Sequence, residues 1–475
     1  MDLIALWLGW LLVWVLGAAV LAAVHGRSTS IGDPGDTAFI VGCGWFVGEF
    51  LLTLCMRLLA AAGIPFGVVV IAAPLAVIGA FAAWIASRRY KKAVSIAIPS
   101  AHRALCAKDL SKPQRLLWFA ILGWLALRFG LLLAEVLRRP LYPWDAWTQW
   151  ATKARVWYEL KTIVPFGPAA AWMNAPAGSV YYDAAPHYPA TVPLTQVWSA
   201  TLLGRWDDAL INLPWWLTAV AFGFAIYGFL RQYRFGQSAA LLGTWLVLSL
   251  PILDTHVALA GYADLAMATY FTLAALAALR FARTRDAADL VLAVFLVSAC
   301  VVIKNPGKIW VAMLVPGLAT ALLPRHGLRF AAACFGAAAI GALVLTRSGM
   351  TILGYHLQLD FDMPWRGLTE AYFDFANWHL LFYGMLAVAL LGWRQLLSRE
   401  LAPLTIIVAA GLAFLMFGFA FTNARLWVED QSTVNRATLH LAPLIVVWMV
   451  MTFRAWSIGQ QSVGAPAAAA GVVGS

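Results

Sequence analysis

The chain has 475 residues, of which 62% are apolar and only 12% are charged, and its mean hydropathy is +0.78. A soluble globular protein of this length needs more charge to cover its surface, so the composition excludes that class and predicts an integral membrane protein. The formal charge of +11 does not indicate nucleic-acid binding, because most basic residues lie in short loops between apolar segments.

Apolar windows of about 20 residues recur along the chain, which predicts an all-α polytopic bundle and not a closed β-barrel. The chain enters the first window directly after Asp2, which favours a retained first helix over a cleaved signal peptide. We expect thirteen transmembrane helices, near residues 3–24, 37–61, 65–87, 116–137, 211–230, 237–255, 262–281, 287–303, 309–323, 327–346, 379–395, 401–422 and 437–453.

The spans predict three parts of the chain. Residues 1–115 form an N-terminal extension of three helices that ends in a basic loop, and residues 116–453 hold the other ten spans. Within the second part, residues 138–210 are too long for a plain connector, so we expect a large outer loop of juxtamembrane helices. Residues 454–475, rich in Ala, Gly, Ser and Val, predict a disordered tail.

The distribution of basic residues predicts the orientation. Pro189–Leu203 is an apolar piece of fifteen residues that begins with proline, so it is read as interfacial or re-entrant and not as a span. Nineteen basic residues then lie on one side of the membrane and twelve on the other. Because cytoplasmic loops are the more basic ones, we expect the N-terminus outside and the C-terminus inside.

Tyr142–Lys161 is the first segment with candidate chemistry. At helical spacing it has one apolar stripe: Trp144, Trp147, Trp150 or Ala151, Ala154 and Trp157 or Tyr158. Asp145 and Lys153 fall mostly on the other face, so the pattern predicts a helix lying flat on the membrane surface and offering a carboxylate. The alternative is that Asp145 is an ordinary helix N-terminal acid after Pro143.

A second polar segment, VYYDAAPHYP, precedes the short apolar piece. Tyr182, Asp183 and His187 could hold a sugar hydroxyl through hydrogen bonds, and we predict them as acceptor or sugar contacts. The alternative is a tyrosine-rich belt at the membrane interface.

Three later turns on the same predicted side also hold polar groups. In DTHVALAGYADL, Tyr262 and Asp264 lie at the outer end of a helix and are predicted acceptor or sugar contacts. In IKNPGK, Lys304 and Lys308 provide donors for a phosphate at headgroup depth, with snorkelling as the alternative. Arg436 and His440 near the last span indicate a cavity, although Arg436 could also snorkel.

Motifs for cofactors and metals are not visible in the sequence. There is no Gly-rich phosphate loop, no Ser-His-Asp order and no His/Cys metal spacing, and the five cysteines show no paired pattern. We therefore expect neither a cofactor nor a metal.

Five short motifs occur in order: WDAWTQWATKARVWY, HYPATVPL, GYADLAMA, IKNPG and NRATLHLAPL. Together they resemble bacterial members of the GT-C superfamily, polytopic glycosyltransferases that use polyprenyl-phosphate-linked sugars, near the mannosyltransferase-like and lipopolysaccharide-sugar-transferase branches. The resemblance covers Leu116 to Pro443 and leaves residues 1–115 outside. Asp145 matches the acidic residue taken as the catalytic base in that family. Relatives commonly read Lys-Asn-Glu-Gly where this chain has Lys304-Asn305-Pro306-Gly307, so the lysine is kept and the carboxylate is not.

The resemblance implies an inverting glycosyltransferase on the periplasmic side of a bacterial inner membrane. It would move a sugar from a polyprenyl-phosphate donor to an envelope glycan or lipid, with Asp145 removing the acceptor proton and Lys304, Lys308 and Arg436 stabilising the departing phosphate.

Two alternatives stay open. A transporter or lipid-linked-sugar flippase would show broken helices with ionisable groups near the bilayer midplane. The candidate groups for that reading are Glu49, Arg57, Arg128 and Glu135. An O-antigen ligase or polymerase would depend on arginine and histidine more than on an aspartate base.

Overall fold

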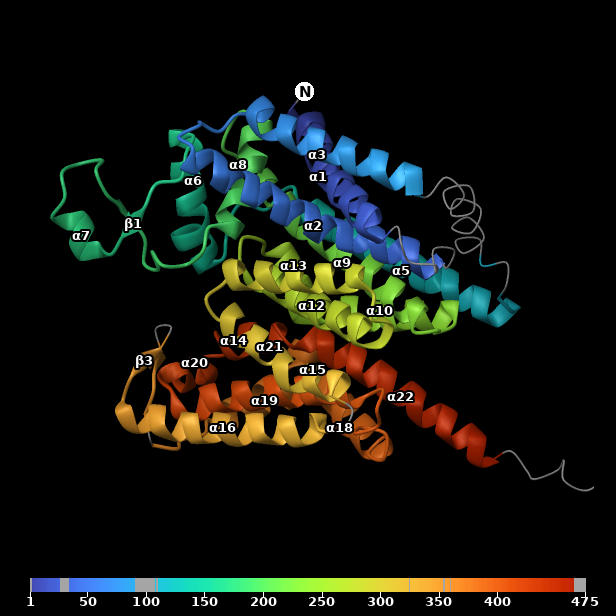
Figure 1. Cartoon of the computed structure of the whole chain (residues 1–475). Coiled ribbons are helices and arrows are strands. Elements are labelled where there is room, and N and C mark those ends of the chain that lie inside the picture. The colour runs from blue at the N-terminus through green and yellow to red at the C-terminus, as the bar shows by residue number, and fades with distance from the viewer. Residues whose placement is uncertain are drawn as a thin grey trace, which may run out of the picture. The chain divides into compact units, whose positions relative to one another are not determined.

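The protein is built almost entirely of helices, as the computed structural model in Figure 1 shows. The structure describes residues 2–25, 34–89, 107, 110–323, 325–352, 355–358 and 360–464. Within these ranges nine helices are long and apolar enough to cross a membrane: α1 (Asp2–His25), α2 (Pro34–Ala61), α3 (Val68–Arg89), α5 (Lys112–Val136), α9 (Leu213–Gln232), α12 (Asp264–Thr284), α16 (Gly327–Ser348), α19 (Ala402–Phe421) and α22 (Ala442–Gly464). The expected all-α polytopic architecture is thereby confirmed.

The expected count of thirteen spans is not confirmed. The described residues give nine, or ten if α10 (Gln237–Leu248) and α11 (Pro251–Ala258) are counted as one span bent by 63°. The other apolar windows form shorter helices: α13 (Ala287–Ile303), α14 (Gly307–Ala312), α15 (Leu314–Leu322) and α18 (Leu381–Leu391). Proline explains two of the breaks, since Pro251 and Pro306 stand directly before or at a helix start.

The chain divides into two compact units. Unit 1 comprises Met1–Ala312 and Asn435–Pro443, and unit 2 comprises Met313–Val434 and Leu444–Ser475. The first three helices, expected as a separate extension, therefore belong to the same unit as the large loop after α5.

Small residues and polar bonds integrate the N-terminal helices into unit 1. A Cβ added at Gly17 of α1 would lie 1.9 Å from the backbone oxygen of Gly44 in α2, so these two helices touch through their backbones. Arg57 of α2 donates to the Thr191 hydroxyl at 2.9 Å, and Thr191 donates to the Val302 carbonyl at 2.6 Å. Loss of this extension would therefore expose the core of the unit.

Loops of unit 1 gather at two ends of its helices (Figure 1). At the end called here the site end, Arg205 pairs with Asp2 at 2.5 Å, and the Phe66 amide donates to the Lys161 carbonyl at 2.7 Å. At the opposite end, called the far end, His25 lies 3.3 Å from Asp289. The segment 138–210 lies at the site end, with the start of α1 and the loop between α2 and α3.

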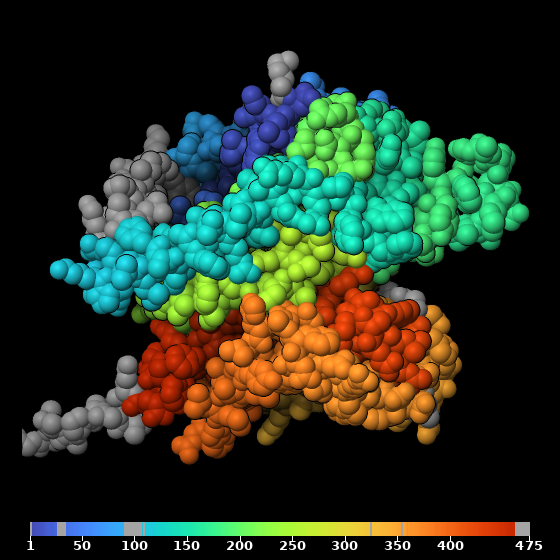
Figure 2. Space-filling model, turned by 180° about the vertical axis from the view of Figure 1, so that it is seen from behind, coloured from blue at the N-terminus to red at the C-terminus, as the bar shows by residue number. Residues whose placement is uncertain are grey.

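The large loop contains η1 (Ala146–Trp150, π-helical), α6 (Ala151–Leu160), β1 (Phe166–Gly167), α7 (Ala169–Met173), β2 (Tyr181–Tyr182), α8 (Thr191–Leu203) and η2 (Leu210–Asn212). Strands β1 and β2 pair in parallel, with Phe166 opposite Tyr181. Figure 2 shows α5 and the residues after it running along one surface of unit 1. Helices are thus present where we expected juxtamembrane helices.

The expected apolar stripe of Tyr142–Lys161 is only half right. Trp144 and Trp147 are 68% and 46% exposed, whereas Lys153, expected on the polar face, is 2% exposed. Ordinary helical spacing accounts for Lys153, since it lies three residues after Trp150 and four before Trp157, on the same face as these buried tryptophans. The part of the stripe in α6 packs against α8, whereas the part at Trp144 and Trp147 is exposed.

Helix α8 covers most of Pro189–Leu203, which was expected to be interfacial or re-entrant and not a span. All thirteen of its residues are buried, which a surface helix would not show. At about 1.5 Å per residue it is also much shorter than the roughly 30 Å hydrocarbon core. It is an interior helix of unit 1.

Unit 2 contains α15, α16, the antiparallel pair β3 (Thr351–Ile352) and β4 (Tyr355–His356), α17 (Trp365–Thr369), η3 (Glu370–Asp374), η4 (Ala376–Trp378), α18, α19, η5 (Asn423–Arg425), α20 (Leu426–Glu429) and most of α22. Its loops pair through Arg425 and Asp362, 2.8 Å apart. Helix α22 continues to Gly464, so residues 454–464 are helical where disorder was expected, and residues 465–475 lie outside the described ranges.

Candidate functional site

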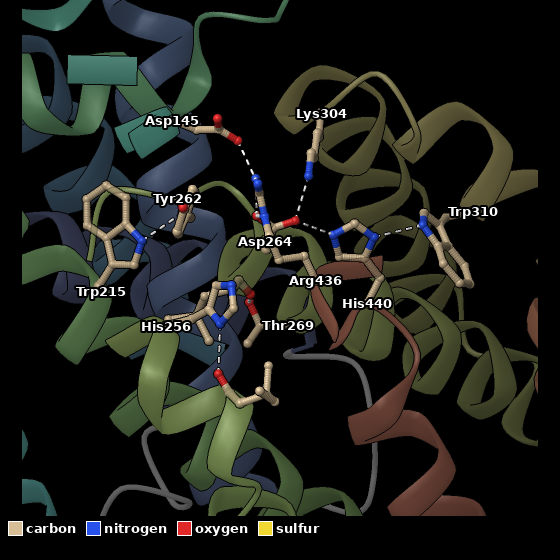
Figure 3. A network of polar contacts seen from close by, with 12 residues as sticks. Asp145, Trp215, His256, Tyr262, Asp264, Thr269, Lys304, Trp310, Arg436 and His440 are labelled. Atoms are coloured by element: carbon tan, nitrogen blue, oxygen red, sulfur yellow. Dashed lines mark hydrogen bonds and ion pairs between the residues drawn. The ribbon is translucent and has the colours of Figure 1, made fainter. Parts of the chain in front are cut away.

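Five charged or polar side chains of unit 1 form one bonded cluster at the site end (Figure 3). Asp264 is at its centre and is fully buried. Its Oδ1 accepts from Lys304 Nζ at 2.5 Å and from His440 Nε2 at 2.9 Å, and its Oδ2 accepts from Arg436 Nε at 3.0 Å. Arg436 Nη1 donates in turn to Asp145 Oδ2 at 2.6 Å. Sequence-distant segments therefore meet at one carboxylate.

The backbone around Lys304 directs this side chain towards Asp264. Helix α13 ends at Ile303, Lys304 is extended, and α14 begins at Gly307. A Cβ on Gly307 would lie 2.0 Å from the Cys300 carbonyl oxygen, so the chain turns back tightly onto α13. Asp264 is the first residue of α12, where the helix dipole also favours a negative charge.

Gly261 brings the Asp145 segment close to the Asp264 segment. Its φ is +108°, and a Cβ there would lie 2.6 Å from Cβ of Ala146, the residue after Asp145. The neighbouring Tyr262 is fixed by Trp215, whose indole donates to the Tyr262 carbonyl at 2.8 Å. Only glycine permits this approach without strain.

Arg436 connects the two carboxylates. Its guanidinium lies over the Tyr262 ring, 4.2 Å from the ring centroid. Burial by itself would lower the pKa of Arg436, but the carboxylates of Asp264 and Asp145 raise that pKa above the ordinary value. Arg436, which α21 (Val434–Leu439) contributes to the cluster, is therefore a permanent cation.

His440 is a neutral hydrogen-bond donor. Trp310 Nε1 donates to His440 Nδ1 at 3.0 Å, so Nδ1 has no proton and Nε2 donates its proton to Asp264. Burial lowers the pKa of His440 to about 4, although the hydrogen bond to Asp264 opposes that effect. Near neutral pH this imidazole adds no charge.

Burial and charge divide the cluster into an interior part and an accessible part. The side chains of Asp264 and Lys304 are 0% and 11% exposed, whereas those of Asp145 and Arg436 are each 24% exposed. Burial lowers the pKa of Lys304, and Asp264 partly restores it. With both cations charged, the cluster is electrically balanced. A ligand arriving from outside meets Asp145 and Arg436 first.

Of the ten predicted site residues, six lie together: Asp145, Tyr262, Asp264, Lys304, Arg436 and His440. Lys308 is exposed on α14, and His187 is exposed in the large loop. Tyr182 is 44% exposed, and its ring centroid lies 6.1 Å from that of Trp172.

Asp183 has a different environment from the one expected for a sugar contact. It is fully buried, and its Oδ2 lies 2.5 Å from Nζ of the buried Lys153. Its other oxygen accepts from the Ala185 amide at 2.9 Å. This arrangement indicates that Asp183 stabilises the large loop.

Several residues near the cluster were not predicted from the sequence. Trp310 and Trp215 fix cluster members, yet an isolated tryptophan in an apolar window gives no signal of that role. The role of Gly261 could have been predicted from the sequence, because a glycine directly before a predicted polar pair often permits a tight turn. His256 is 5% exposed, its ring lies 5.6 Å from Tyr262, and its Nε2 has no hydrogen-bond partner in the described chain.

A small cavity lies in unit 1 apart from the five cluster side chains. A cavity lined by Glu49, Thr195, Trp215 and Thr218 has room for about one water molecule, which is too little for a sugar. Within the described ranges no three His, Cys, Asp or Glu side chains converge to hold a metal ion. No protein-family model, curated protein or solved structure matches this chain.

Proposed function

We propose that unit 1 is the catalytic unit of a membrane glycosyltransferase. It would move a sugar from a polyprenyl-phosphate donor to an envelope acceptor, with inversion and with Asp145 as general base. The supporting observation is the contact of 2.6 Å between Asp145 and Arg436 in a cluster that also contains Lys304. Direct transfer needs a proton acceptor and a cationic site for the departing phosphate close to each other.

The proposed reaction makes one bond and breaks one. The acceptor oxygen attacks the anomeric carbon while its proton passes to Asp145, a contribution of about 10²–10⁴ in rate. The bond from that carbon to the phosphate oxygen breaks, and the phosphate leaves with the bonding pair. Arg436 and Lys304 would stabilise its added charge, and Asp264 acts as a positioning residue because it holds both cations.

A lipid-linked donor also fits the apolar surroundings of unit 1. Only 17% of the α5 span is buried, and its exposed residues include Leu116, Leu127 and Leu131. A polyprenyl chain could remain beside such a helix in hydrocarbon while its phosphate reaches the site end.

We propose that the site end faces the periplasm of a bacterial inner membrane. Arginines concentrate at the far end of unit 1, where α9, α12 and their following turns contribute Arg231, Arg234, Arg280, Arg283 and Arg285. Basic loops remain in the cytoplasm, which gives an external N-terminus and an internal C-terminus.

Mass spectrometry of lipid-linked sugars tests the function. Cells without the protein should accumulate one polyprenyl-phosphate sugar, and that donor should then support transfer by purified protein in nanodiscs. Asp145→Asn should reduce turnover by about 10²–10⁴, since it removes the general base. Glu159→Gln, which changes an exposed acid on α6, is the matched control and should retain activity. Full turnover by the Asp145→Asn protein would exclude the base role.

A transporter or flippase is the second candidate, and one observation favours it. Helices α10 and α11 are bent by 63°, and Asp254 of α11 pairs with Arg128 of α5. Broken helices with ionisable groups are typical of transport sites. The test is movement of a fluorescent lipid-linked sugar across the membrane of proteoliposomes. If Asp254→Asn abolishes this movement and Asp145→Asn does not affect it, transport is favoured over sugar transfer.

A further inference from the structure

All three guanidinium nitrogens of Arg436 contact the protein's own carboxylates. Nε and Nη2 both lie 3.0 Å from Asp264 Oδ2, and Nη1 lies 2.6 Å from Asp145 Oδ2. In the proposed reaction Nη1 would be needed by the departing phosphate, and the Asp145 carboxylate would be needed by the acceptor proton. In this structure the two groups neutralise each other.

The two carboxylates differ in how readily they can give up Arg436. Asp264 has no exposed surface and also binds Lys304 and His440. Asp145 is 24% exposed and precedes the π-helical turn η1, so its side chain can leave Arg436 without uncovering a buried charge. An anion from outside would therefore exchange with Asp145 and leave Asp264 in place.

We propose that Nη1 of Arg436 is the binding position for a phosphate ester, and that this phosphate displaces Asp145 and so frees its carboxylate to accept a proton. The inference rests on the proposed function and adds the regulation of its site. The Asp145 oxygen that accepts from Arg436 Nη1 is not available to an acceptor hydroxyl while that contact persists. Displacement by the donor phosphate frees this oxygen. The base then becomes active only when a donor is bound.

Charge balance gives this proposal a consequence that is easily measured. Asp145 and the phosphate compete for the same cation, so removal of the aspartate charge should strengthen phosphate binding. Binding of dodecyl phosphate, which has a lipid chain and a phosphate but no sugar, should be about tenfold tighter to Asp145→Asn than to wild type, equivalent to about 1.4 kcal/mol. Asp145→Glu keeps the charge and should show no gain.

The measurement is isothermal titration of the full-length protein in nanodiscs with dodecyl phosphate and, separately, with inorganic phosphate. Tighter binding of dodecyl phosphate alone identifies a lipid phosphate as the ligand, whereas an equal gain for both probes identifies free phosphate. Arg436→Gln should lose binding in either case, and Glu159→Gln should match wild type. If Asp145→Asn unfolds, Asp145→Ser provides the same loss of charge.

Equal or weaker binding by both neutral variants would overturn the competition. This outcome is distinguishable from failure of the proposed function, because the titration involves no sugar transfer. Active transfer without any gain in affinity would remove only the competition. A gain in affinity without transfer would leave the competition intact and remove the glycosyltransferase proposal.

Discussion

At the residue scale, Asp145 and Asp264 are the same side chain in two environments. Asp264 is enclosed and accepts from three donors, so its replacement would leave Lys304 without its carboxylate partner in the interior and Arg436 with Asp145 alone. Asp145 shares Arg436 but remains partly exposed. Burial thus distinguishes the enclosed carboxylate of Asp264 from the accessible carboxylate of Asp145.

His440 gives a prediction for stability against pH. Its pKa falls from 6.5 to about 4 in the folded protein because of burial, while the unfolded chain keeps the ordinary value. Between these two values the unfolded state binds more protons, so stability is complete above pH 6.5 and falls as the pH decreases towards 4. Thermal unfolding of the protein in nanodiscs at pH 7, 6, 5 and 4 measures the loss.

His440→Asn is the comparison variant, because the amide can still donate to Asp264 but does not titrate in this range. Its unfolding temperature should change less than that of wild type between pH 6.5 and pH 4. Identical pH profiles would contradict the assignment of a neutral, buried His440.

At the scale of the element, the sequence predicted which turns contain the polar residues but not how helices break around them. Apolar windows located the helices, and the polar residues at Asp145, Asp264, Lys304 and Arg436 stood out because charges are costly in such windows. The break between α10 and α11 was not predicted, although Pro251 lies at it, because the apolar window continues on both sides of the proline.

Tertiary partners were the second limit. Lys153 lies three residues after Trp150 and four before Trp157, so helical spacing permits its burial but does not show what neutralises it. Its partner is Asp183, 2.5 Å away and far along the loop, which periodicity cannot reveal. Trp310 likewise gains its role only through its tertiary contact with His440.

The turn before Asp264 gives a prediction about positioning. Gly261→Ala would place a Cβ 2.6 Å from Ala146 at a φ of +108°, a strain of about 1–3 kcal/mol. The turn and the Asp145 segment should move apart, and transfer activity should fall at least about tenfold, as expected for a misplaced catalytic group. The assay is turnover with the lipid-linked donor beside thermal unfolding.

Gly123→Ala is the control for this variant, because a Cβ at Gly123 in α5 meets no atom within 4 Å. It should retain activity and stability. A fully active Gly261→Ala protein would show that close contact between the turn and η1 is not required.

At the scale of the whole molecule, the arrangement of charge connects the site to one side of a membrane. In unit 1 the balanced cluster lies at the site end, whereas His25, Asp289 and several arginines lie at the far end. The N-terminal helices bury polar bonds that reach α8 and α13, so the extension stabilises the same unit that holds the cluster. The position of α1, α2 and α3 thus gives these helices a structural role, although the motif resemblance does not cover them.

Labelling of single cysteines tests the orientation on which the proposed chemistry depends. In a background in which the five native cysteines are replaced by alanine, Ser179→Cys introduces an exposed thiol at the site end and Gly236→Cys one at the far end. A membrane-impermeant maleimide added to spheroplasts should label position 179 and not position 236, and lysis should make both reactive. The reverse pattern would put Asp145 in the cytosol, where a donor presented in the outer leaflet cannot reach it.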